Sequence, residues 1–184
     1  MSISRRDVRR ERQERRFGFC TAGSLAGLSG GTGACSTLET VPDDFFARLG
    51  GLSLPVPRYL RILMGRYLKY VPRAYKAEVP ALFAMKVRCP STFGGRWFAP
   101  GFKGASGPSI VVILHPDESY QRAVLQHELT HWLRWLDSQK KDWEGRHDAA
   151  FLQEVEKAYK TFGVDRSVAV NIEHTAKPGF MSAD

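Results

Sequence analysis

The chain has 184 residues, of which 43% are hydrophobic and 25% are charged, as in ordinary globular proteins. Its formal net charge of +8 favours anionic partners, such as nucleic acid, anionic lipid or an acidic protein. No apolar run approaches the ~20 residues of a membrane-spanning helix. The three cysteines form no CxxC pair, so they suggest neither a disulfide framework nor a cysteine zinc site.

The first 40 residues have the composition of a basic arm and a flexible linker. Residues 1–16 carry seven arginines against three acidic residues, which gives +4 of the total charge. This arm is either a disordered tail or a segment that contacts nucleic-acid phosphates. Residues 18–40 are rich in glycine, serine and threonine, as linkers are. Arg15-Arg16 resembles a twin-arginine export signal, but the following stretch is too polar, so we expect a cytoplasmic protein, with export as the alternative.

Residues 41–164 are expected to form the folded domain, and residues 165–184 a C-terminal tail. Hydrophobic spacing and proline positions predict its helices, and β-branched or alternating runs predict its strands. The expected helices cover 42–51, 57–71, about 118–137 and 147–162, and the expected strands cover 81–88, 96–99 and 109–114. The predicted fold class is therefore α+β, with a small, mostly antiparallel three-stranded sheet packed on about three helices.

The predicted helix near residue 127 carries the sequence His127-Glu128-Leu-Thr-His131. Histidines four residues apart lie on one face of a helix, where they can bind one zinc ion. Glu128 would project beside the metal, where it can accept a proton from water and pass it to a leaving amine. The longer HExxHxxGxxH pattern is absent, because Arg134 replaces its glycine and Asp137 its last histidine.

A catalytic zinc site usually has a third protein ligand, and His147 is the best candidate. It follows a turn and begins the next amphipathic helix, which can direct it toward the first two histidines. Glu154 or Asp148 could instead supply a carboxylate. His115, before a proline, and His174, in the expected tail, are weaker candidates.

The stretch HELTHWLRWLDSQKKDWEGRHDAAF, residues 127–151, resembles the SprT-like metalloprotease family. It is similar to that family's HExxH helix, polar loop, glycine-histidine turn and following aromatic residue. Residues 93–97 and the strand before His115 resemble the family's pre-catalytic sheet. The resemblance covers about residues 96–162, with weaker support back to residue 57.

This resemblance implies a zincin-like zinc endopeptidase with His127, His131 and His147 as Zn2+ ligands and Glu128 as general base. The substrate would be a protein or peptide, and eukaryotic members of the family cleave proteins crosslinked to DNA. Two features differ from the family pattern: Arg146 separates Gly145 from the histidine, and the cysteine zinc ribbon of many relatives is absent.

Other functions remain open at this point. In one, zinc only stabilises a structural or assembly protein, and the arginine arm binds nucleic acid or a partner. In another, the chain is an exported, toxin-like protease. Trp132, Trp135 and Trp143 could stack on nucleobases, although the burial tendency of aromatic residues favours the core for Trp132 and Trp135. No membrane partner is expected, and the oligomeric state is left open.

Overall fold

The structure, a computed structural model, describes residues 43–51, 53–86, 94–141, 147–173 and 180–181. The arm and linker of residues 1–40 lie outside this described part. Within it, five α-helices and two short 3-10 helices surround a three-stranded sheet. In chain order the elements are α2 (Phe45–Leu49), α3 (Arg58–Tyr70), η2 (Arg73–Glu78), β1 (Ala81–Met85), β2 (Gly95–Phe98), η3 (Phe102–Gly104), β3 (Ser109–Ile113), α4 (Glu118–Asp137), α5 (Ala149–Phe162) and α6 (Arg166–Ile172). The α+β class is thus confirmed.

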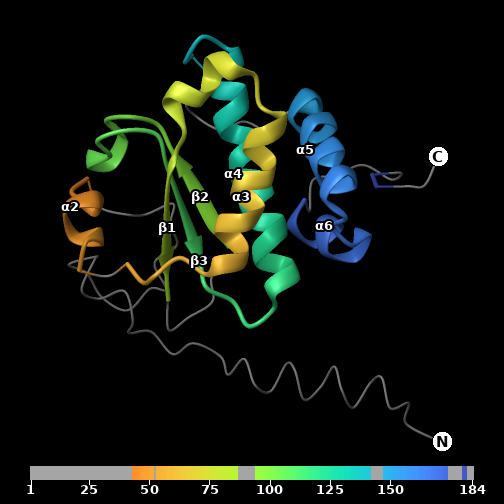
Figure 1. Ribbon diagram of the computed structural model, residues 1–184, viewed down its shortest axis with the longest axis horizontal. Coiled ribbons are helices and arrows are strands. Elements are labelled where there is room, and N and C mark those ends of the chain that lie inside the picture. Colours follow the sequence, from red (N-terminus) through yellow and green to blue (C-terminus); the bar gives the residue numbers. More distant parts are fainter. Residues whose placement is uncertain (1–42, 52, 87–93, 142–146, 174–179, 182–184) are drawn as a thin grey trace, which may run out of the picture.

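The sheet has the strand order β1-β3-β2, with the strongest predicted strand in the middle. All five residues of β3 are buried, as a run of β-branched side chains covered on both faces should be. Its odd-numbered residues Val111 and Ile113 pack toward α2, and its even-numbered residues Ile110 and Val112 pack with α3 and α4. Helices therefore cover both faces of the sheet (Figure 1).

The expectation of a mostly antiparallel sheet was wrong, because the sheet is mixed. β3 pairs antiparallel with β2 but parallel with β1. Strands that are consecutive in the chain commonly pair with each other, which would place β2 beside β1. Instead β2 crosses to the far side of β3, where Gly94 and Gly95 meet α4.

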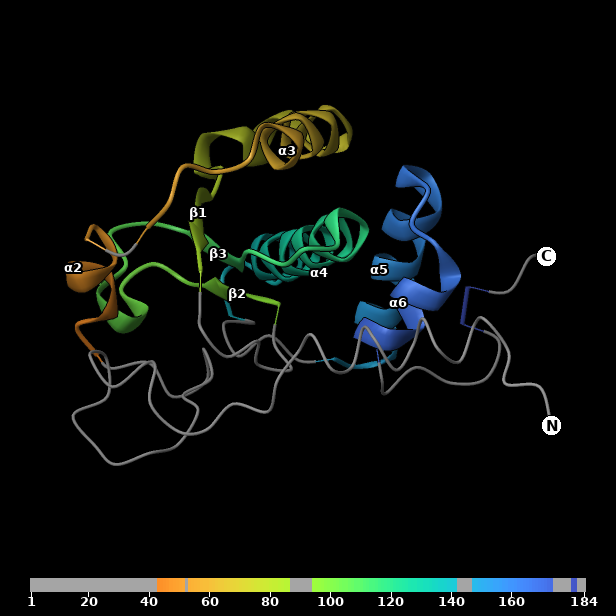
Figure 2. The ribbon, with the colours of Figure 1, turned by 90° about the horizontal axis from the view of Figure 1, so that it is seen from below.

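Helix α4 is the centre of the molecule. It contacts β2 and β3 as well as α3, α5 and α6. Figure 2 shows it below α3, with the sheet on one side and the α5–α6 pair on the other. All ten residues from Ala123 to Trp132 are buried, so this helix has no solvent-facing side along its middle.

Part of the segment interpreted as a tail forms α6. Asp165 caps this helix by accepting a hydrogen bond from the backbone N–H of Ser167 at 2.7 Å. Ala169 is fully buried and packs with Phe151, Val155 and Tyr159 in a small core between α4, α5 and α6. The short length of α6 and its place after Gly163 concealed it from the sequence pattern.

Candidate metal centre

Local sequence explains where α4 starts and how it approaches β2. Asp117 caps the helix by accepting hydrogen bonds from the backbone N–H groups of Ser119 at 2.8 Å and Tyr120 at 3.3 Å. At the β2 end, a Cβ on Gly95 would lie 2.7 Å from Val124 and 3.0 Å from the Val111 carbonyl oxygen. Glycine is therefore required for α4 to lie this close to the strand.

The three predicted histidines come together on the α5 side of α4. The Nε2 atom of His131 lies 3.0 Å from that of His127 and 2.9 Å from that of His147, and the His127–His147 distance is 3.1 Å. Three nitrogens bound tetrahedrally at about 2.0–2.1 Å from zinc would lie roughly 3.3 Å apart. These three side chains are therefore close enough together to hold a metal ion.

An ion pair between α4 and the start of α5 fixes the position of His147. The guanidinium of Arg134 donates to both carboxylate oxygens of Asp148, at 2.8 and 2.9 Å. Asp148 also caps α5 by accepting a hydrogen bond from the Phe151 backbone N–H at 2.9 Å. Asp148, considered as a ligand from the sequence, is thus engaged elsewhere, and neither it nor Glu154 belongs to the cluster.

An aromatic ring closes the apolar side of the cluster. Phe151 is fully buried. Its ring centroid lies 4.3, 4.8 and 4.9 Å from those of His131, His147 and His127 respectively. Such an apolar wall limits water access, and burial disfavours a charged imidazole, although at His127 the hydrogen bond to Glu173 and the nearby carboxylate charges outweigh burial and raise the pKa. Burial, followed by the charges of His127 and His147, indeed lowers the pKa of His131 well below its ordinary value.

Sequence reasoning missed Glu173, which contacts the His127 ring on Nδ1, the nitrogen that faces away from the other two histidines. Its Oε1 atom lies 2.5 Å from Nδ1 of His127 and accepts a hydrogen bond from the Tyr159 hydroxyl at 2.8 Å. Burial raises the pKa of Glu173, but the hydrogen bond and charge of His127 outweigh it, so the net pKa is lowered. An ionised carboxylate on Nδ1 fixes the tautomer that presents Nε2 to a metal.

One signal in the sequence could have revealed this residue. Val164, Val168 and Ile172 recur every four residues around the helix cap Asp165, and they pack against the buried core of α5 and α6. That spacing is typical of a short amphipathic helix, which would have placed Glu173 at its end.

Glu128 points away from the histidine triangle toward β2. Its Oε2 atom accepts a hydrogen bond from the Trp97 backbone N–H at 2.7 Å. The Gly94 carbonyl accepts a hydrogen bond from the Ile113 N–H, and in an antiparallel pair every second residue directs its backbone groups at the partner strand. The backbone groups of Trp97 therefore face away from β3, which leaves its N–H available to Glu128. Burial raises the pKa of Glu128, and the opposing influence of His127 and the Trp97 N–H does not cancel it. The other carboxylate oxygen has no hydrogen-bond partner among the described residues.

The remaining candidates lie apart from the cluster. His115 accepts a hydrogen bond from the Asp117 backbone N–H at 3.0 Å and serves the turn before α4. His174 and Trp143 are outside the described residues. Trp132 and Trp135 are 0% and 4% exposed, which confirms their expected place in the core.

Comparison of the chain with models of protein families, with curated proteins and with solved structures finds no match. Among the described residues, no helix combines the length and apolar character needed to cross a membrane.

Proposed function

We propose that the chain is a zinc-dependent endopeptidase of the SprT-like, zincin type. The observation that carries this proposal is the convergence of three imidazole nitrogens beside a buried glutamate on one helix. Neutral histidine nitrogens are ligands that zinc favours, and the described residues supply no fourth ligand within the cluster. A three-ligand site with an open position is typical of catalytic rather than structural zinc.

His127, His131 and His147 would hold the ion, which when bound would supply a Lewis acid and an activated water. The residues of this chain supply the rest. Glu128 keeps one carboxylate oxygen on Trp97 and has the other available to accept a proton from water and deliver it to the leaving amine. Its raised pKa brings the carboxyl closer to neutral pH, where both transfers are efficient.

The substrate proposed is an extended segment of a protein. β2 is an edge strand, and the backbone groups of Gly95 and the carbonyl of Trp97 face away from β3, while the Trp97 N–H is already bonded to Glu128. An extended peptide can add to such an edge through main-chain hydrogen bonds. The net charge of +8 supports substrates found near DNA, because a basic protein concentrates on nucleic acid.

The test measures bound zinc and peptidase activity on the same preparations of wild type, Glu128→Gln and Glu118→Gln. Glu118 is exposed at the start of α4, so its variant is a matched control for the amide substitution. We expect stoichiometric zinc in all three proteins. Hydrolysis should fall at least ~100-fold in Glu128→Gln, because general acid–base catalysis contributes factors of about this size, and should persist in Glu118→Gln. Equal hydrolysis by both variants would exclude the mechanism.

The second candidate is a non-catalytic protein in which zinc ties elements together. The observation that favours it is burial: His127 and His131 are only 8% and 6% exposed, and the cluster joins α4 to α5. Stoichiometric zinc without hydrolysis of any protein substrate, with or without DNA, would support this structural or assembly role.

A further inference from the structure

The outer face of α3 is a continuous row of cations. Arg58, Arg61, Arg66 and Lys69 are all exposed, and the helix contains no acidic residue. Their spacing of three to five residues places them along one side of the helix. Within the described part of the chain, none of the four has an ion pair or hydrogen bond from its side chain. We call this face of α3 the basic stripe.

A glycine lies in the middle of the basic stripe with no internal reason for it. Gly65 is exposed in the interior of α3, and a Cβ added there would meet nothing within 4 Å. Glycine destabilises a helix interior relative to alanine. Because no element in the described part of the chain needs the space, the missing side chain leaves the helix backbone open to close approach by a partner.

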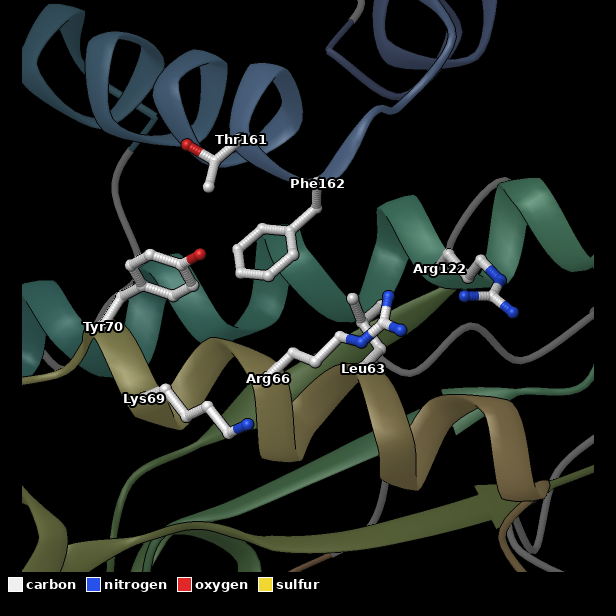
Figure 3. Close-up of a pocket in the computed structure, with 7 residues that line it drawn as sticks. All are labelled: Leu63, Arg66, Lys69, Tyr70, Arg122, Thr161 and Phe162. Carbon is white, nitrogen blue, oxygen red and sulfur yellow. The ribbon is translucent and has the colours of Figure 1, made fainter.

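The stripe leads into a hollow of about 370 Å³ between α3, α4 and the end of α5. Figure 3 shows Tyr70 reaching from α3 toward Phe162 and Arg66 extending toward Arg122 of α4, whereas the amino group of Lys69 points away from Phe162. Tyr70 is 73% exposed, and its ring meets Phe162 edge-on at 5.7 Å. The Phe162 ring stacks at 5.5 Å on the buried Tyr67, which holds this aromatic platform in place.

We infer that the basic stripe and the Tyr70–Phe162 platform form a binding surface for single-stranded nucleic acid. A row of cations follows a phosphate backbone, and an exposed aromatic ring stacks on a base without regard to sequence. An anionic membrane fits less well, because α3 buries its apolar face in the core and exposes only Ile62 and Tyr70 as large apolar residues.

The surface lies on the opposite side of α4 from the histidines. Leu125 and Leu129 of α4 pack in the core cluster that includes α3, whereas His131 stacks on Phe151 of α5. A strand bound along α3 therefore leaves the metal centre accessible. The inference does not depend on hydrolysis, and binding can be measured without it.

The first test compares Gly65→Glu with Gly65→Gln in the full chain. A Cβ at this exposed position meets nothing within 4 Å, and both residues favour the helix over glycine, so both variants should fold. Binding is measured by fluorescence anisotropy of a labelled oligothymidine of about 15 nucleotides, a length that one small site can cover. The glutamate should weaken binding at least ~10-fold relative to the glutamine, because it places a negative charge among the phosphates. Equal affinities, or no binding by wild type, would overturn the inference.

A second test separates the stripe from net charge and from the arginine arm. Arg66→Ala/Lys69→Ala is compared with Lys86→Ala/Arg166→Ala, which removes the same charge from exposed positions elsewhere. Only the first pair should change the slope of a plot of the logarithm of the association constant against the logarithm of the salt concentration. The slope should become shallower by about 1.4, because two contacts to single-strand phosphates are lost. The same change of slope in both double variants would show that binding depends on overall charge, and it would contradict the proposed binding surface on α3.

Tyr70→Ala tests the platform. We expect it to weaken oligothymidine binding roughly tenfold without changing the salt dependence, because stacking is not ionic. An unchanged affinity for oligothymidine would show that the Tyr70–Phe162 platform takes no part in binding. Stripe-dependent binding to phosphatidylserine vesicles together with stripe-independent binding to oligothymidine would overturn the inference in favour of a membrane.

Discussion

At the scale of residues, the histidine cluster is organised by groups that are not themselves ligands. Glu173 fixes the His127 ring, the Arg134–Asp148 ion pair fixes the start of α5, and the Trp97 N–H fixes Glu128. Loss of a partner of this kind typically costs about 10- to 100-fold in metal affinity, because such partners set the orientation and tautomer of each ring.

Glu173→Gln is expected to weaken zinc binding by about 10- to 100-fold, the usual effect of losing a carboxylate behind a ligating histidine. Competition with a chromophoric chelator measures this affinity. Glu154→Gln is the matched control, since Glu154 is exposed on α5 and outside the cluster. Zinc affinity that falls in the control but not in Glu173→Gln would contradict both the positioning role and the ligand assignment.

At the scale of elements, α6 closes the side of the cluster that α4 and α5 leave open. Its Ala169 packs against the buried side chains of Phe151 and Tyr159, and Glu173 follows directly after its last residue, where it contacts His127. Helix α5 ends at Phe162 and is capped by Gly163, which adopts a left-handed φ of +67°, so the chain reverses there and α6 folds back on α4.

A chain ending at Gly163 should therefore be less stable and bind zinc more weakly than one ending at Met181, which keeps α6 and Glu173. Exposing large side chains such as Phe151 and Tyr159 is expected to lower the free energy of unfolding by about 3 kcal/mol or more. Urea denaturation measures the stability, and the chelator competition measures the affinity. Equal stabilities and equal zinc affinities for the two chains would show that α6 contributes neither to the fold nor to the metal site.

At the scale of the whole molecule, α4 separates two faces of different chemistry. On one side lie the histidines and the edge strand β2, and on the other lies the basic stripe of α3. Because α4 is buried along its middle, a metal that joins it to α5 would stabilise the entire domain and not only the site.

Zinc at about 100 times its dissociation constant is expected to stabilise the fold by about 2.7 kcal/mol. For a chain of this size that corresponds to a rise in Tm of roughly 5–10 °C, measured by calorimetry. The rise should vanish in His131→Ala and persist in His115→Ala, whose imidazole lies outside the cluster. A rise retained in His131→Ala would show that zinc binds elsewhere.

The sequence by itself determined the local features of this protein. Periodicity and capping located α3, α4, α5 and β3, and the four-residue spacing placed His127 and His131 on one face. His147 was also predicted, because it directly precedes a helix that must pack its apolar side on α4. These predictions depend on interactions between residues close in the chain, which a linear pattern records.

Only the tertiary structure decided the pairing of β1 with β3, the close approach of Gly94 and Gly95 to α4, and the contact between Glu173 and His127. Each joins segments separated by tens of residues, and nothing in the local pattern specifies which distant partner a strand edge or a buried carboxylate will meet. The Glu173 contact links positions 46 residues apart in the chain. It exists because α6 folds back on α4, and that path is set by burial of the whole core and not by the residues of α6 alone.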